Sequence, residues 1–157
     1  MLWALVRPLF RLSPRPLWGW RRFLLRLFGA KIGSHVHIYP SVRVMIPWHL
    51  TVGEGSAIGD RAYLYSLGSI VIGRRVTVSQ NAHLCAGTHE WRDESMPLIK
   101  SPITIGDDCW ICADAFVGPD VSIGERAILA ARGVAVRDVA PGIIVGGNPA
   151  VPIGERD

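Results

Sequence analysis

The chain has 157 residues, of which 49% are hydrophobic, and it contains 17 glycines and 11 prolines. That length suits one domain with a sizeable core, and the composition excludes a disordered chain. The net charge of +4 is unevenly spread, because residues 1–31 hold seven basic side chains and no acidic one, whereas the remainder holds ten basic and 13 acidic ones. This asymmetry predicts that the basic end faces an anionic surface, either a membrane or a polymer.

The first segment, residues 1–31, shows helical spacing with a basic polar face. Within residues 14–31 the apolar side chains share one helical face and the polar positions share the other: Leu17, Trp20, Leu24, Leu27 and Phe28 against Arg15, Gly19, Arg22 and Arg26. We expect one amphipathic helix here. Two roles remain open for it, a cap over the open end of a repeat structure or contact with an anionic membrane. No apolar run approaches the ~20 residues of a spanning helix.

From Ile32 onward the chain repeats every six residues. Each hexad begins with an aliphatic residue, often continues with Gly at a sharp corner, and has a small residue in fifth place. Five groups of three hexads cover residues 32–49, 52–69, 72–89, 105–122 and 123–140. A period of six fits neither a helix nor an alternating strand, but it fits three short strands per turn of a coil. Residues 32–157 are therefore predicted to form a triangular parallel β-helix of about five coils.

An insertion at residues 90–102, EWRDESMPLIKSP, interrupts the repeat directly after His89. Because it contains Trp91 and follows a histidine, we expect it to cover a functional site, although a tolerated surface loop is the simpler alternative. In the regular repeat, His49, Ser69 and His89 occupy equivalent positions and are expected to lie above one another.

The chain contains in order RRFLLRLFGAKIG, HIYPSV, IGDRAYLYSLGSIVIG, TVSQNAHLCAGTHEWRD, PITIGDDCWICADAFVGPDVSIGE and GGNPA. Together these stretches resemble the hexapeptide-repeat acyltransferases, and among them the colanic-acid-type exopolysaccharide acetyltransferases. The resemblance implies an all-β, left-handed parallel β-helix that forms a homotrimer with active sites between subunits. It also implies acetyl-CoA as co-substrate, no required metal, and a sugar hydroxyl, free or lipid-linked, as acceptor in exopolysaccharide biosynthesis.

The same resemblance assigns roles to individual residues. The histidine after the third coil, His89, matches the general base, and the pantetheine of acetyl-CoA runs along coil edges at Ala113 and Ala131. Asn148 lies in the terminal GGNPA, on the cofactor side. The family often continues this motif with a basic residue that reaches the CoA phosphates, but here Val151 follows, so Arg137 or Arg156 is expected to supply that charge.

The acceptor side of the expected site departs from the family pattern. Ser66 stands where the family often has an acceptor-holding Asn. Trp91 is a candidate for stacking on a sugar ring, and Asp93 for orienting His89 or the acceptor. A sugar hydroxyl needs a base to take its proton, and His, with a reference pKa of ~6.5, gives about 10²–10⁴-fold assistance.

Other classes of function place different demands on the sequence. A zinc hydratase of the same fold needs three converging His ligands, but His83 and His89 are six residues apart and fall on successive sides of the coil. A xenobiotic or small-sugar acetyltransferase and a non-catalytic scaffold remain alternatives. The lone CxxC at 109–112 does not indicate zinc, and three cysteines favour a reducing cytoplasm, with contact at the inner membrane face left open. The basic residues lie on an apolar helix and not along a groove, which argues against nucleic acid.

Overall fold

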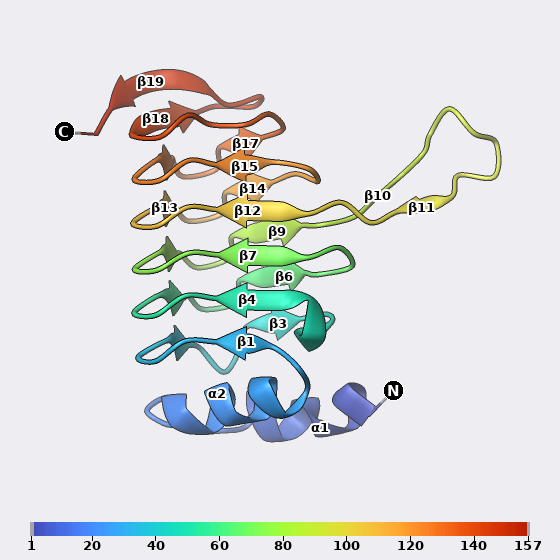
Figure 1. The fold of residues 1–157 in the computed structure, drawn as a ribbon, viewed down its shortest axis with the longest axis vertical. Helices are drawn as coiled ribbons and strands as arrows, with labels where there is room; N and C mark the ends of the chain where they lie inside the picture. Colours follow the sequence, from blue (N-terminus) through green and yellow to red (C-terminus); the bar gives the residue numbers. More distant parts are fainter. Residues whose placement is uncertain (1, 157) are drawn as a thin grey trace.

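The computed structural model describes residues 2–156 and shows a stack of short strands with two helices across its first end (Figure 1). Helices α1 (Leu2–Arg11) and α2 (Trp18–Leu27) precede every strand. The strands then form three sheets around one core, and the chain passes through the sheets in turn. The predicted parallel β-helix is confirmed, with two N-terminal helices where we expected one.

Each sheet is a ladder of parallel strands from successive turns. The first sheet holds β1 (Lys31–Ile32), β4 (Leu50–Val52), β7 (Ile70–Ile72), β12 (Ile103–Ile105) and β15 (Ser122–Ile123). The second holds β2 (His37–Ile38), β5 (Ala57–Ile58), β8 (Thr77–Val78), β13 (Trp110–Ile111), β16 (Ile128–Leu129) and β18 (Ile143–Gly146), with β19 (Val151–Glu155) antiparallel at its end. The third holds β3 (Arg43–Val44), β6 (Tyr63–Tyr65), β9 (His83–Cys85), β14 (Phe116–Val117) and β17 (Val134–Ala135).

The coil is left-handed. In Figure 1 the front strands β1, β4 and β7 run leftward while β3, β6 and β9 return rightward behind them, and the chain rises from the helices toward β19. Because β18 adds a sixth level to the second sheet, the stack has about six turns, one more than the hexads alone predict.

The register agrees with the hexads, because each aliphatic first position pairs with the same position of the next turn. In the first sheet Ile32, Val52, Ile72, Ile105 and Ile123 form one continuous column. All five are at most 6% exposed, and equivalent columns of buried aliphatic residues fill the other two sheets. The core is thus a stack of aliphatic side chains that no single turn can bury.

The repeated glycines at the second hexad position have a different structural role from the one expected. They were predicted to permit a sharp corner, but the left-handed backbone lies at the fourth hexad position, in His35, Arg61, Arg75, Asn81, Asp108, Asp114, Asp120, Arg126 and Arg132. At the second position the reason is space. A Cβ on Gly106 would lie 2.6 Å from the backbone nitrogen of Glu125, so only glycine lets successive turns approach there.

The helices close the first end of the stack by hydrogen bonding as well as by packing. Along the strands, backbone N–H groups of one turn donate to carbonyls of the turn above, for example from His37 to Ser56. The matching carbonyls of the first turn have no turn below them, and side chains of the helices donate to four of them. Arg26 donates to Ile32, Arg22 to Val36, Arg21 to Ile38 and Trp3 to Val44.

The predicted face of the N-terminal helix is wrong in one respect. Leu24 packs on the first turn and is buried together with Leu25, but Leu17, Trp20 and Leu27 of the same proposed face are exposed. The arginines cause this difference, because Arg22 and Arg26 turn toward the first-turn carbonyls and rotate the other apolar side chains outward.

Replacing Gly106 by Ala should destabilise the stack, since the new methyl group meets backbone that cannot move aside. We expect a cost of about 1–3 kcal/mol and a melting temperature lower by several degrees in calorimetry. Gly19→Ala is the matched control, because Gly19 lies in α2 with its nearest neighbour 3.8 Å from the added Cβ. That control should be neutral or slightly stabilising, and equal melting temperatures for the two variants would refute the close-approach explanation.

Candidate active site

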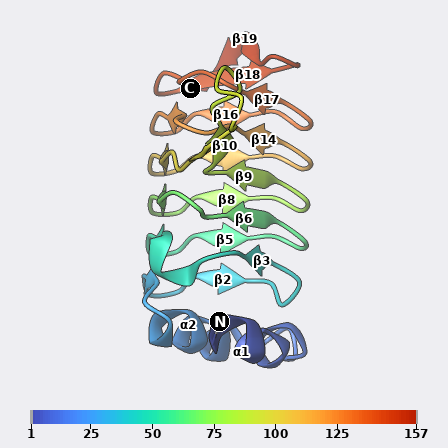
Figure 2. The same cartoon turned by 90° about the vertical axis from the view of Figure 1, so that its right-hand side faces the viewer.

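His89 lies on an arm that leaves the stack. After β9 the chain extends outward in β10 (Thr88–His89), turns, and returns antiparallel in β11 (Leu98–Ile99), with His89 opposite Leu98. Figure 1 shows this arm projecting from one corner of the coil, and Figure 2 shows it from its end. The insertion predicted at 90–102 is thus the outer part of an ordered hairpin that carries His89 at its base.

The imidazole of His89 is oriented by the backbone of its own arm. Its Nδ1 lies 2.5 Å from the carbonyl oxygen of Met96. Because a carbonyl oxygen can only accept, Nδ1 carries the hydrogen, and Nε2 of the neutral ring is left with a free lone pair. The side chain is exposed, so Nε2 is available to a molecule that binds beside the arm.

The other predicted residues of the arm, Trp91 and Asp93, form no hydrogen bond with His89 in the described structure. The carboxylate of Asp93 accepts hydrogen bonds from the backbone N–H and the hydroxyl of Ser95, each at 2.8 Å, and these bonds lower its pKa. Asp93 therefore shapes the turn, and the predicted orienting role for His89 belongs to Met96. Trp91 is 69% exposed, with the guanidinium of Arg92 over its ring at 4.2 Å.

Ala113 and Ala131 lie at one corner, between the second and third sheets, in successive turns. The N–H of Arg132 donates to the carbonyl of Ala113 at 2.9 Å, which joins the two turns at this corner. Within residues 2–156, the backbone N–H groups of Ala113 and Ala131 have no hydrogen-bond partner. This corner thus presents two unused donors in a row, which suits the amide carbonyls of an extended ligand.

The C-terminal end of this corner distinguishes the two candidate basic residues. Arg137 lines a recess of about 310 Å³ together with Ala150, Val151 and Pro152, next to the GGNPA motif. Arg156 instead donates to the carbonyl of Asp108 at 2.6 Å and fixes the C-terminal strand to the stack. Arg137 is the residue free to meet a ligand phosphate, whereas Asn148 is exposed in the tight connection between β18 and β19.

One subunit does not bring these groups together. His89 follows the end of β9, while Ala113 precedes the start of β14, the next strand of the same sheet. The arm and the donor corner therefore lie at opposite edges of the third sheet. A site that uses both requires a second copy of the chain, with the arm of one copy against the corner of the other.

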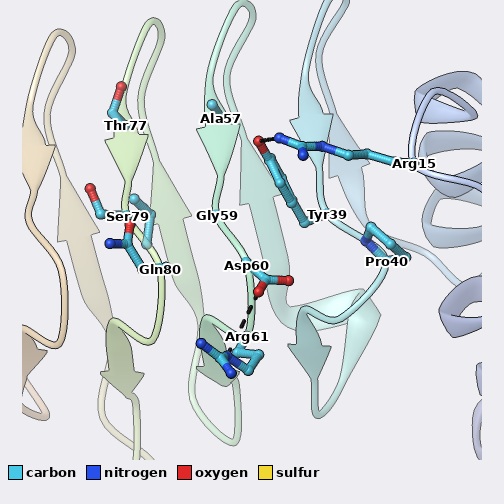
Figure 3. Close-up of a pocket in the computed structure, with 11 residues that line it drawn as sticks. Arg15, Tyr39, Pro40, Ala57, Gly59, Asp60, Arg61, Thr77, Ser79 and Gln80 are labelled. Carbon is cyan, nitrogen blue, oxygen red and sulfur yellow. Dashed lines mark hydrogen bonds and ion pairs between the residues drawn. The ribbon is translucent and has the colours of Figure 1, made fainter.

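A polar recess lies lower on the same corner. It has a volume of about 580 Å³ and is lined by side chains that include Tyr39, Asp60, Thr77, Ser79 and Gln80. Figure 3 shows Arg15 reaching from the helical end to the Tyr39 hydroxyl, with Asp60 paired to Arg61. Hydrogen bonds from Asn81 to Asp60 and from Asp114 to Gln80 place this recess directly below Ala113 along the corner. The hexads mark these turn positions only as polar, so sequence reasoning missed the recess.

Ser66 serves the fold. Its side chain is fully buried, and its hydroxyl accepts from the N–H of Ile46 and donates to the carbonyl of Ile46, both at 2.9 Å. This position leaves no surface for an acceptor. The expected column of His49, Ser69 and His89 is also wrong, because the N–H of Ile103 donates to the carbonyl of Ser69 and the chain has left the stack before His89.

An aromatic column on the outer face of the third sheet was also missed. Tyr63 and His83 stack with ring centroids 4.9 Å apart, and Phe116 meets His83 edge-on at 5.2 Å. Burial, with a further contribution from Arg43, lowers the pKa of His83. The alternation of Tyr63-Leu64-Tyr65 was the available signal, since it points both tyrosines outward.

The candidate metal and thiol groups stay apart. Cys109 and Cys112 are free, and burial raises the pKa of the Cys109 thiol to about 11. His83 lies in its aromatic column and His89 on the arm. Across residues 2–156, no three His, Cys, Asp or Glu side chains gather as a metal site would require.

Comparisons with known proteins agree with this architecture. Residues 102–134 match the family described as bacterial transferase hexapeptide (six repeats). The chain is 44% identical, over 98% of its length and 85% of the relative, to a protein named as the colanic acid biosynthesis acetyltransferase WcaF of Escherichia coli (strain K12).

Solved structures share the fold at lower identity. A hexapeptide-repeat acetyltransferase of Vibrio cholerae in complex with acetyl coenzyme A has a TM-score of 0.88 and 23% identity, with 98% of this chain and 85% of that chain covered. A galactoside acetyltransferase in complex with coenzyme A has a TM-score of 0.90 and 21% identity, covering 98% and 78%. The hexads, the left-handed coil and the 44% sequence identity with WcaF show that the chain belongs to the hexapeptide-repeat acetyltransferases, in the group of the colanic acid biosynthesis acetyltransferases.

Proposed function

We propose that this chain transfers an acetyl group from acetyl-CoA to a hydroxyl group of a saccharide in exopolysaccharide biosynthesis, with His89 as the general base. The observation that carries the proposal is the hydrogen bond between Nδ1 of His89 and the Met96 carbonyl, which leaves Nε2 free to accept a proton. Acyl groups on coenzyme A are the donors suggested by the complexes of the related folds.

The reaction needs few groups from the protein. Nε2 of His89 takes the proton of the sugar hydroxyl as its oxygen attacks the thioester carbonyl. The tetrahedral intermediate collapses, the C–S bond breaks, and the imidazolium returns the proton to the departing thiolate of coenzyme A. Backbone N–H groups at the coil corner are suited to stabilise the oxyanion.

We assign the complete site to the interface between two subunits of a homotrimer. His89 leaves the stack at the third turn, and the third turn of the opposite corner holds Gln80. With the arm of one subunit against this corner of the next, the donor runs along Ala131 and Ala113 with its phosphates near Arg137. The thioester then ends at the height of His89.

The acceptor is assigned to the polar recess below. Its hydroxyl, carboxylate and amide side chains suit hydrogen bonds to sugar hydroxyl groups, and it adjoins the height at which the thioester ends. Trp91 on the partner's arm is placed to cover a sugar ring. The acceptor is a free or lipid-linked saccharide, and peripheral membrane contact through residues 1–31 belongs to the lipid-linked form.

Substitution of His89 by Ala should abolish most turnover without loss of the fold, because the side chain is exposed. We expect kcat to fall by about 10²–10⁴-fold, measured as acceptor-dependent thiol release from acetyl-CoA with a panel of saccharides. His35→Asn is the matched control, since His35 is an exposed histidine far from the arm and Asn tolerates its positive φ. Unchanged turnover in His89→Ala would remove His89 as the base.

A shared site predicts complementation between two inactive variants. His89→Ala lacks the base, and Ala131→Trp obstructs the donor corner with a bulky side chain at an exposed position. Random mixing in a trimer leaves roughly a quarter of the sites with an intact base facing an intact corner, so co-expression should restore about that share of wild-type activity. If the mixture is as inactive as each variant alone, while mixed trimers are detected, the site lies within one subunit.

A further inference from the structure

The two N-terminal helices expose an apolar surface at the end of the stack. Three leucines of α1 and a fourth just after it are exposed at helical spacing, and four large apolar residues on and just before α2 are exposed as well. Their exposed fractions are Leu2 72%, Leu5 76%, Leu9 57%, Leu12 84%, Leu17 47%, Trp20 39%, Phe23 53% and Leu27 65%. We call these eight residues the end face.

The end face is one surface. The indole N–H of Trp20 donates to the carbonyl of Leu9 at 3.1 Å and joins α2 to α1. Phe23 stacks on Trp20 with ring centroids 5.8 Å apart, and an apolar groove between the helices is lined by Leu9, Leu12, Leu17 and Trp20. Figures 1 and 2 show both helices lying across the end of the stack, where these exposed residues are found.

The cap does not require these residues. The residues that pack in the core are others: Trp3 and Phe10 of α1, which are 6% and 1% exposed, and Leu24 and Leu25 of α2. Both helices therefore carry exposed large apolar residues in addition to those that pack on the stack, although a surface helix of a soluble domain buries its apolar side. A large exposed apolar patch of this kind marks a surface that a membrane or another protein covers.

The charge around the end face specifies what covers it. The first acidic residue of the sequence is Glu54, and eight basic residues precede it. Arg21, Arg22 and Arg26 are held by first-turn carbonyls, and Arg15 is exposed but donates to the Tyr39 hydroxyl, whereas Arg11 is exposed at the rim. Arg11 shares a recess with Arg43 and Arg61, so the rim that borders the first turns is strongly cationic. An apolar plane with a cationic rim is complementary to the acyl chains and phosphates of an anionic bilayer.

We propose that the end face inserts into one leaflet of an anionic membrane, with the helices parallel to the surface and the rim arginines at the lipid phosphates. Neither described helix is long and apolar enough to span a bilayer, which agrees with a helix pair lying in the interface. The binding itself is independent of the transferase activity. Only its purpose, to present lipid-linked acceptors to the recess above, rests on the proposed function.

Vesicle flotation with the full chain tests this inference. The probes are vesicles of phosphatidylcholine alone and of phosphatidylcholine with phosphatidylglycerol. We expect binding to the anionic vesicles that weakens as salt is raised, and binding at least about tenfold weaker for the double variant Leu5→Ser, Leu12→Ser. The matched control is Val136→Ser with Ile153→Ser, two residues 52% and 63% exposed elsewhere on the stack. It should bind like the wild type.

Each other outcome overturns the proposal. Absence of wild-type binding to anionic vesicles does so, and so does equal binding by the wild type and the Leu5, Leu12 variant. A smaller assembly for that variant in light scattering, without vesicle binding by the wild type, would show that a second copy covers the end face. Thiol release with a soluble saccharide is measured in parallel. If the wild type fails to bind vesicles but releases thiol normally, this inference fails while the proposed function stands. If thiol release fails while vesicle binding is normal, the proposed function fails and this inference stands.

Discussion

No turn of this coil is stable by itself, and the whole structure follows from that constraint. Each turn buries its aliphatic column only against the next turn, and along the strands N–H groups donate to carbonyls of the turn above, as Gly33 does to Val52 and His37 to Ser56. The stack therefore ends in unpaired carbonyls at the first turn. Four of these carbonyls accept hydrogen bonds from side chains of the helices, namely Arg21, Arg22, Arg26 and the indole of Trp3. This explains why a basic segment precedes an apolar solenoid.

The same regularity explains the departure at His89. A strand residue within the stack forms backbone hydrogen bonds with neighbouring turns. Its side chain points either into the core or outward from the face of a sheet. The hairpin of β10 and β11 supplies its own pairing, so it can extend beyond the corner while remaining ordered. This arrangement holds the imidazole of His89 by a short hydrogen bond within the arm and leaves its other nitrogen accessible.

The repeat, its three sheets and the buried first positions were predictable from the sequence because a six-residue period has one simple structural explanation. The position of His89 beside an insertion was also visible. The role of Ser66 was not, since only the stacked structure shows that its hydroxyl is consumed by Ile46. The outward rotation of Trp20 and Leu27 was hidden for the same reason: helical spacing identifies a face, but the carbonyls that attract Arg22 and Arg26 decide which face turns inward.

The number of turns between the N-terminal helices and the arm determines how far His89 lies from the end face. His89 leaves from the third turn, two rises of about 4.8 Å above the first, and the helix layer adds about 10 Å more. With His89 as the proposed base, the reacting hydroxyl would lie roughly 20 Å from the plane of the end face. A single sugar attached at that plane is too short to reach it, whereas an oligosaccharide or a phosphate-bridged headgroup is tall enough. The height of the stack would in this way select membrane-anchored acceptors by their length, independently of side-chain contacts with their sugars.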